Sequence, residues 1–176
     1  PYLFVGTGLS MRYAHAPSWD ALLYGIWRMI NPLRDVRDYE KLRQGIERDI
    51  YSKYADLTEE DKKYYINPVL ASKIEEDFCS RYYSMQDFDT EIFTKEENDE
   101  ILTKRYNPFK YYIARQLAQV KLDASMPDSH ELRYFTQNQN KFAGVITTNY
   151  DFILEQLFQD FSVVIGQDNL LVSNTL

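Results

Sequence analysis

Two short polar segments, far apart in the chain, carry the residue types best suited to binding a ligand. Gly6-Thr7-Gly8-Leu9-Ser10 follows the apolar run Tyr2–Val5, and residues 147–151, Thr-Thr-Asn-Tyr-Asp, follow the apolar residues 144–146. Each pattern predicts a strand that ends in a polar turn. Because ligands of an open parallel sheet bind just beyond the carboxyl ends of its strands, the two turns are predicted to meet at one nucleotide pocket.

Glycine suits the first segment because it lets a backbone approach a phosphate group closely. The amides of a following helix N-terminus then donate hydrogen bonds and lie at the positive end of the helix dipole. Gly6 and Gly8 occupy such positions, but the dinucleotide pattern G-x-G-x-x-G is incomplete, since Met11 stands at its third glycine position. Taken alone, this segment is equally compatible with a tight turn that binds nothing.

Three segments in this order resemble the SIR2-like family. They are residues 4–10, Phe-Val-Gly-Thr-Gly-Leu-Ser; Pro17-Ser18-Trp19, followed by Leu22-Leu23; and residues 146–151, Ile-Thr-Thr-Asn-Tyr-Asp, followed by Leu154-Glu155. The resemblance is to the branch found in bacterial anti-phage defence proteins rather than to the sirtuin deacetylases. It covers roughly a quarter of the chain, at its two ends, and is specific because three motifs occur in the family's order.

The resemblance implies a Rossmann-like fold that binds NAD as a substrate and cleaves it. It implies that Asn149 is catalytic beside the nicotinamide ribose and that Asp151 is catalytic where it contacts the nicotinamide amide. Fixed polar groups there would stabilise the positive charge that develops on the ribose as the glycosidic bond breaks. The NAD-binding residues that it implies are Gly6, Thr7, Gly8, Leu9, Ser10, Thr148, Asn149 and Asp151. From the residues alone, Asn149 could instead cap the next helix, and Asp151 could complement its dipole.

Departures from the sirtuin deacetylases narrow the expected activity. Deacetylases hold zinc with four cysteines, and Cys79 is the only cysteine here, so we expect no zinc and no deacetylation. Ser18-Trp19 also stands where deacetylases carry Phe-Arg. The family's catalytic histidine lies in a Lys-x-His-Gly motif, and none follows Asp151. This chain alone is therefore expected to be inactive.

The two histidines are not predicted to replace the missing base. His15 matches no family position and is expected in an exposed loop, and His130 is expected in the first turn of a helix. Thr136-Gln137-Asn138 imitates the Thr-Gln-Asn of sirtuins, but the residues after it do not fit, so the site is placed at residues 148–151.

The composition excludes several classes of function. The chain of 176 residues can make one domain, or a domain with a lid, and its net charge of −7 argues against nucleic-acid binding, which draws on clustered Lys and Arg. No apolar stretch is long enough to span a bilayer, so no membrane contact is expected, and the single cysteine fits a reducing, cytoplasmic compartment. Because Pro1 directly precedes an apolar run and the end is polar, we expect a piece of a longer protein.

The spacing of apolar residues predicts a mainly helical middle. One helix is predicted from the N-cap Ser18 to Asn31-Pro32, and a second over residues 36–54. A third is predicted to start at residues 58–61, which resemble a capping box, and to break at Asn67-Pro68. Further helices are predicted after that break and from Pro108. The charged residues 96–100 indicate a solvated loop or a short helix. Toward the end, residues 143–147 predict a strand, Ile153 begins a helix, and residues 161–165 predict another strand, ended by Gly166.

These observations predict an α/β fold, a Rossmann-like parallel sheet with a large helical insertion, as an incomplete domain. Residues 1–19 and 142–176 would form the Rossmann-like portion, and residues 20–141 the insertion. The predicted function is that of a homo-oligomeric NAD+ hydrolase, which releases nicotinamide and an ADP-ribose product in prokaryotic anti-phage defence, with a phage protein as trigger. Two alternatives stay open: a non-catalytic sensor of NAD or an ADP-ribose derivative, and a helical oligomerisation scaffold.

Overall fold

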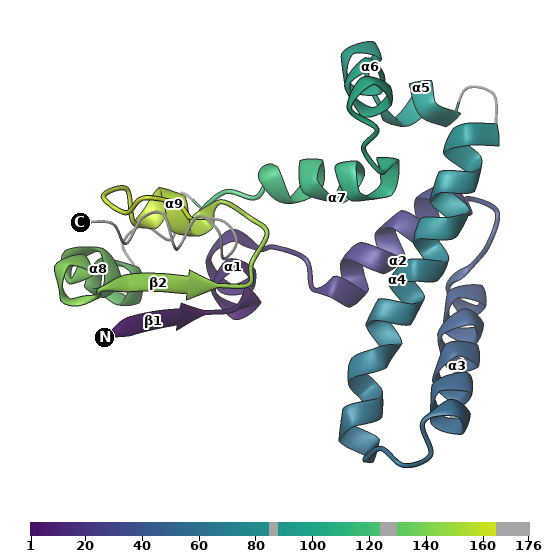
Figure 1. The fold of residues 1–176 in the computed structure, drawn as a ribbon, viewed down its shortest axis with the longest axis horizontal. Coiled ribbons are helices and arrows are strands. Elements are labelled where there is room, and N and C mark those ends of the chain that lie inside the picture. Colours follow the sequence, from purple (N-terminus) through teal and green to yellow (C-terminus); the bar gives the residue numbers. More distant parts are fainter. Residues whose placement is uncertain (85–87, 124–129, 165–176) are drawn as a thin grey trace. The chain divides into compact units, whose positions relative to one another are not determined.

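The computed structural model describes residues 1–84, 88–123 and 130–164. Over these ranges the chain forms nine α-helices, one 3₁₀ helix and two strands, so it is mostly helical with a small parallel sheet (Figure 1). It divides into two compact units: an α/β unit, made by Pro1–Ala16 and the described residues from Gln116 onward, and a helical unit, Pro17–Arg115. Residues 116–141, which are predicted from the sequence to be part of the insertion, lie in the α/β unit where they are described.

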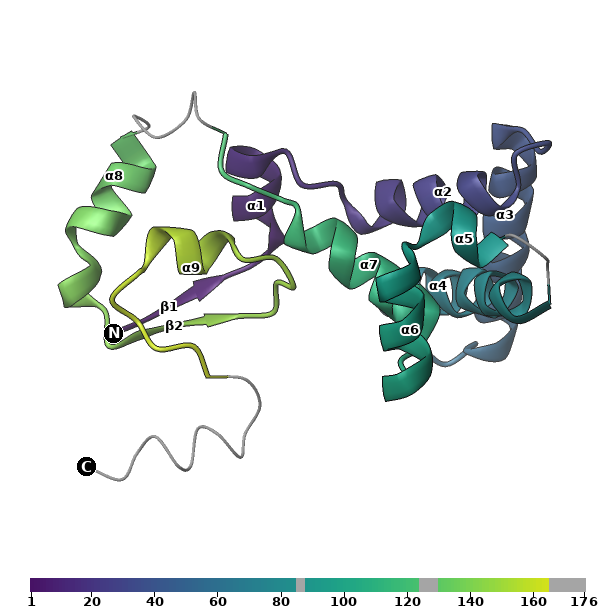
Figure 2. The ribbon, with the colours of Figure 1, turned by 90° about the horizontal axis from the view of Figure 1, so that it is seen from above.

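A two-stranded parallel sheet lies at the centre of the α/β unit. β1 (Tyr2–Val5) and β2 (Gly144–Thr147) run side by side in the same direction (Figure 2). Both predicted strands are thereby confirmed, the second with a start one residue later. The register pairs Val5 with Thr147, so the residues that follow both strands emerge at the same edge of the sheet.

Alternation along the strands decides which sheet face is buried. Leu3, Val5 and Val145 pack into one apolar cluster with residues of the unit's helices, whereas Phe4 of the opposite face is 76% exposed. The helical segments of the unit are α1 (Thr7–Ala14), α8 (His130–Gln137), the 3₁₀ helix η1 (Gln139–Lys141) and α9 (Ile153–Leu157). The predicted helices at His130 and Ile153 are confirmed.

The strand predicted over residues 161–165 is wrong in its described part. Residues 161–164 have no strand conformation, and Val163 is 61% exposed. Phe161 instead stacks on Phe158, with 5.6 Å between the ring centroids. An apolar run becomes a strand only where a neighbouring strand pairs with it, and no such pairing joins residues 161–164 to β1 or β2. Ile165 and Gly166, the predicted end of this strand, lie outside the described residues.

Local capping residues begin most helices of the helical unit. These helices are α2 (Trp19–Ile30), α3 (Val36–Lys53), α4 (Glu59–Ser84), α5 (Phe88–Ile92), α6 (Lys95–Lys104) and α7 (Pro108–Ala118), the last of which continues past Arg115. Ser18 Oγ accepts a hydrogen bond from the backbone N–H of Ala21 at 3.2 Å. Thr58 Oγ1 accepts from the backbone N–H of Asp61 at 3.1 Å. The predicted N-termini of α2, α4 and α7 are confirmed.

The predicted helix break at Asn67-Pro68 is wrong, because α4 continues through Pro68. Proline removes one helical hydrogen bond, but the buried face of the helix carries on across it. That face consists of Lys62, Ile66, Leu70, Ile74, Phe78 and Tyr82, one residue in every four. Burial on both sides of Pro68 therefore outweighs the local cost.

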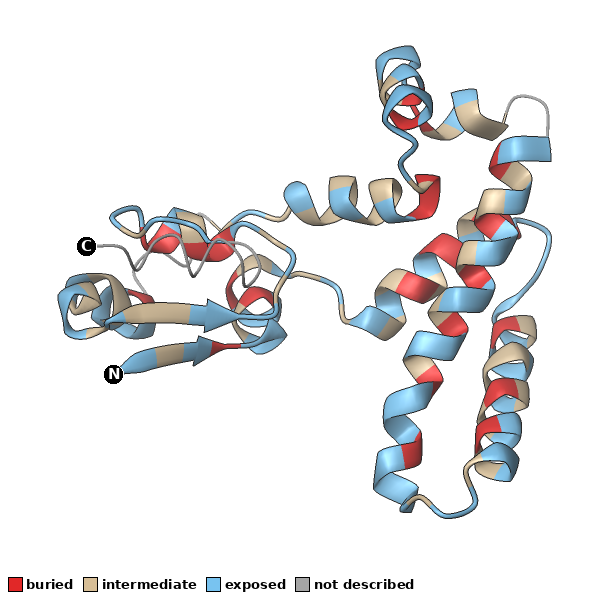
Figure 3. Cartoon of the chain, in the orientation of Figure 1, coloured by how far each residue is buried: buried red, intermediate tan, exposed pale blue. Residues whose placement is uncertain are grey.

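The core of the helical unit is formed chiefly by α2, α3 and α4. Buried residues alternate with exposed ones along each of these helices (Figure 3). Trp27 and Phe78 are among the largest fully buried side chains, and Phe78 makes edge-to-face contacts with Phe88, Phe93 and Phe109. Tightly packed aromatic rings of this kind account for much of the unit's apolar burial.

The charged residues 96–100 lie in α6, so the second of their two predicted conformations, a short helix, is confirmed. Thr94 and Glu97 form a capping box, in which Thr94 Oγ1 accepts from Glu97 N at 3.2 Å and Glu97 Oε2 accepts from Thr94 N at 2.9 Å. In the part of the chain that the structure describes, no helix is long and apolar enough to cross a membrane.

Candidate functional site

The turn after β2 is fastened to the end of β1 by Thr147. Its hydroxyl donates to the carbonyl oxygen of Val5 at 2.9 Å and accepts from the backbone N–H of Asn149 at 3.0 Å. From the sequence, Thr147 is both the last residue of the predicted strand and the first of the polar segment 147–151, and it is not among the predicted site residues. A hydroxyl residue at the last position of a strand was the available signal, since it can bond its own turn.

The side chain of Asn149 joins the two polar segments. Asn149 Nδ2 donates to the carbonyl oxygen of Gly6 at 3.2 Å and to Ser10 Oγ at 3.1 Å. Ser10 is only 1% exposed, so this contact is shielded from water. Asn149 Oδ1 is also buried, and among the described residues it has no hydrogen-bond partner. A buried acceptor without a partner is costly, and a ligand donor would satisfy it.

The space beside the two glycines is open. A Cβ atom added to Gly6 or Gly8 would meet no other atom within 4 Å. Gly6 has a φ of −105°, which other residues adopt readily, so the turn itself does not require glycine there. A group that approaches the backbone closely, as a phosphate does, would explain both glycines.

The N-terminus of α1 adds backbone N–H groups beside this open space. Gly6 is its N-cap and offers no side chain, and the first turn of α1 holds no acidic residue. The first amides of any helix lack helical acceptors and lie at the positive end of its dipole. The electrostatics at this end of α1 therefore favour an anion.

Asp151 and Thr148 follow Asn149 and differ from it in their contacts. Asp151 Oδ1 accepts from the backbone N–H of Ile153, the first residue of α9, at 3.1 Å. Asp151 thus lies at the start of α9, as expected if it complements the dipole of that helix. Its second carboxylate oxygen has no hydrogen bond to the described residues and could accept one from a ligand. Asn149 does not cap α9, whose N-cap is Phe152. Thr148 is exposed.

The two histidines lie elsewhere. His15 is exposed at the C-terminal end of α1, and its Nε2 lies 3.0 Å from Asp123 Oδ2. Gly6 and His15 flank the eight residues of α1 at opposite ends, which separates them by about 13 Å along the helix axis. His130 is the exposed first residue of α8, as predicted. Neither histidine adjoins Asn149.

No metal site accompanies this arrangement in the ranges described: no group of three or more His, Cys, Asp or Glu side chains there is placed to hold an ion. The groups that could hold an organic ligand are the first amides of α1, Asn149 Oδ1 and the free oxygen of Asp151.

Comparisons with protein-family models, with curated proteins and with solved structures found no match to this chain.

Proposed function

We propose that the α/β unit is the NAD-binding part of an NAD+ hydrolase that releases nicotinamide and an ADP-ribose product, and that it depletes NAD in prokaryotic anti-phage defence. In this proposal β1 and β2 belong to a Rossmann-like sheet. The observation that carries the proposal is the pair of hydrogen bonds from Asn149 to Gly6 and Ser10. They unite the two segments that resemble the SIR2-like family.

The first segment supplies the phosphate-binding half of the site. The amides that begin α1, beside the open space at Gly6 and Gly8, would donate to the NAD diphosphate. Two negative charges at a helix N-terminus are favourable because the dipole is positive there. An acidic side chain in this turn would oppose the diphosphate, and α1 has none.

The second segment supplies the groups at the bond that breaks. Asn149 is already oriented by Gly6 and Ser10, which leaves its Oδ1 to accept a ribose hydroxyl. The free oxygen of Asp151 accepts from the nicotinamide carboxamide. The Asn149 side chain is held by the protein before the substrate binds, and the substrate must displace whatever covers its buried Oδ1 before that oxygen can stabilise the developing ribose cation.

The resemblance assigns deprotonation of the attacking group to a histidine in a Lys-x-His-Gly motif, which this chain of 176 residues lacks. The chain by itself is therefore expected to bind NAD without turnover, and hydrolysis is proposed for a longer protein that contains this chain.

The first prediction concerns Asn149→Ala, which removes the amide that joins the two segments. We expect the variant to lose nicotinamide release in the longest natural form of the protein, with and without a candidate phage trigger. Asn140→Ala is the matched control, because Asn140 is exposed in η1 of the same unit. The control should keep wild-type turnover.

The outcomes of this experiment separate the candidate functions. Turnover that Asn149→Ala abolishes and Asn140→Ala retains supports the hydrolase. Calorimetric NAD binding without wild-type turnover under any condition would replace the hydrolase by a sensor. If this chain binds neither NAD nor ADP-ribose, the α/β unit is not an NAD-binding domain.

A further inference from the structure

The helical unit contains a cavity that the proposed NAD site does not use. Its volume is about 490 Å³, within the range of small-molecule pockets. The lining residues that matter here are Met29, Ile30, Arg81, Phe88, Glu91 and Arg115, from α2, α4, α5 and α7. The lining mixes polar and apolar surface in about equal parts and carries two arginines, in a chain whose net charge is negative.

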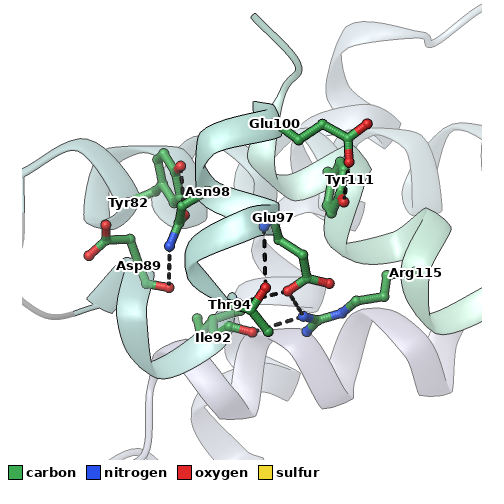
Figure 4. A network of polar contacts seen from close by, with 9 residues as sticks. All are labelled: Tyr82, Asp89, Ile92, Thr94, Glu97, Asn98, Glu100, Tyr111 and Arg115. Carbon is green, nitrogen blue, oxygen red and sulfur yellow. Dashed lines mark hydrogen bonds and ion pairs between the residues drawn. The ribbon is translucent and has the colours of Figure 1, made fainter. Parts of the chain in front are cut away.

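Arg115 is held in place on one side of its guanidinium group. Nη1 donates to the carbonyl oxygen of Ile92 at 3.0 Å and to Glu97 Oε2 at 2.8 Å (Figure 4). Glu97 is itself fixed by the capping box with Thr94. The guanidinium carbon lies 5.2 Å from the ring centroids of both Phe93 and Tyr112. These contacts position the arginine before any ligand arrives.

The other edge of the guanidinium group is not used in this way. Nε of Arg115 is buried and has no hydrogen-bond partner within the described residues. Nε and Nη2 form one planar edge, whose two parallel N–H groups match the two oxygens of a carboxylate. A buried donor of a charged group without an acceptor is unfavourable, so a carboxylate at this edge would be stabilised.

We propose that this cavity binds a small organic carboxylate with an apolar or aromatic body. The Nε and Nη2 edge of Arg115 holds the carboxylate, and Arg81 adds a second positive charge at the lining. The body of the ligand contacts Met29, Ile30 and Phe88. Because Nε is shielded from solvent, binding must shift a side chain that covers it. The NMR signal of this N–H group therefore reports directly whether a carboxylate has bound there.

The lining residues include two arginines and one carboxylate. Glu91 is the one carboxylate among the lining residues and is exposed, so water screens it more than it screens the partly buried arginines. Glu97 is not a lining residue, and its ion pair with Arg115 offsets part of the charge of both groups. The aromatic faces of Phe93 and Tyr112 are also occupied by the Arg115 guanidinium, so they are not available to a ligand cation.

The test uses 2-naphthoate and its neutral analogue 2-naphthylmethanol as probes of this chain. The Nε–Hε resonance of Arg115, identified by its loss in Arg115→Lys, is followed by NMR during each titration. We expect 2-naphthoate to shift this resonance and to bind about tenfold more tightly than the neutral analogue. No shift of the resonance, or equal affinity for the two probes, overturns the proposal.

Two variants that do not touch the packed guanidinium group complete the test. Arg81→Gln should weaken 2-naphthoate binding about fivefold, and Glu91→Gln should strengthen it about threefold, because each changes one charge at the lining. Arg48→Gln, at an exposed position outside the cavity lining, is the control and should bind like wild type. Weaker binding in Glu91→Gln, or unchanged binding in Arg81→Gln, contradicts an anion site.

Discussion

Individual residues at the ends of the strands explain why two segments so far apart in sequence can share one site. The bond from Thr147 to Val5 aligns the turn, and the amide of Asn149 then reaches Gly6 and Ser10. Each contact spans the two segments, so none is a local interaction. The unpartnered Oδ1 of Asn149 is the one buried side-chain oxygen of this turn that the described protein groups leave unsatisfied.

The second prediction tests why glycine occupies position 8. Gly8 lies in α1, and a Cβ there meets open space, so Gly8→Ala should raise the free energy of unfolding by about 0.5 to 1 kcal/mol, as alanine does in helices. If a ligand phosphate uses that space, NAD affinity should fall about tenfold in the same variant. Chemical denaturation and calorimetry measure the two effects separately.

Gly45→Ala in α3 is the control for this prediction. Gly45 also faces open space within a helix, so alanine should stabilise the protein there without changing NAD affinity. If Gly8→Ala binds NAD as tightly as the wild type, no phosphate uses the space beside Gly8, and the first glycine segment is only a tight turn.

The third prediction concerns the pH dependence of Cys79. Burial raises the pKa of the Cys79 thiol, with Glu75 adding a smaller charge repulsion. At a given alkaline pH the folded chain therefore holds less thiolate than the unfolded chain, and iodoacetamide should alkylate it more slowly. The pH profile of the alkylation rate should have its midpoint above that of the same chain in urea.

The raised pKa of the Cys79 thiol also makes the free energy of unfolding depend on pH. Because the unfolded chain loses the thiol proton first, this group should lower the free energy of unfolding as pH rises above the unfolded pKa and toward the folded one. Coincident alkylation profiles of the folded and unfolded chains would show that Cys79 is not buried in solution.

Among the secondary-structure elements, α4 best illustrates competition between local and tertiary effects. Pro68 has no N–H to donate to the carbonyl of Tyr64, and its ring crowds that turn. The helix nevertheless continues, because Ile66 before the proline and Leu70 after it are both buried in the core of the helical unit. A break here would expose one half of that buried face to water.

The fourth prediction is that Pro68→Ala stabilises the helical unit. Alanine restores the missing hydrogen bond, and we expect the free energy of unfolding to rise by about 1 to 3 kcal/mol. Urea denaturation followed by circular dichroism measures this change. Ala71→Pro, in the same helix, should instead lower stability by about 3 kcal/mol or more. A loss of stability in Pro68→Ala would mean that the proline ring itself contributes to packing.

At the scale of the whole molecule, the helical unit has a core of its own. Its apolar cluster runs from Leu23 to Phe109, and every buried member lies within Pro17–Arg115. The α/β unit has a separate cluster around Val5, Tyr13 and Ile153. Each cluster buries its own side chains, which is the usual basis of independent folding.

The fifth prediction follows from these separate cores. A polypeptide of residues 17–118, which retains the whole of α7, should fold alone and unfold cooperatively in urea, with a native-like near-ultraviolet circular dichroism spectrum from Trp27 and its neighbours. Phe78→Ala in that polypeptide should cost about 3 to 5 kcal/mol, because Phe78 is fully buried. A gradual, uncooperative transition would show that the helical unit needs the rest of the chain.

The starts of α2, α4 and α7 depend on neighbours a few residues away, and for that reason the sequence by itself determined them. Ser18, Thr58 and Pro108 begin helices through bonds or fixed dihedrals within their own first turn. The two strands and the polar turns after them were equally local patterns. The residues proposed for the candidate site were chosen from the same kind of local pattern, residue type by residue type.

The tertiary structure alone decided what depends on partners remote in sequence. The continuity of α4 through Pro68, the absence of a strand over residues 161–164 and the separate helical core all depend on which surfaces become buried together. So does the contact of Asn149 with Ser10, because only the parallel register of β1 and β2 brings the two side chains within 3.1 Å. Burial and strand pairing are set by the whole fold, whereas caps and periodicity are set by the nearest turn.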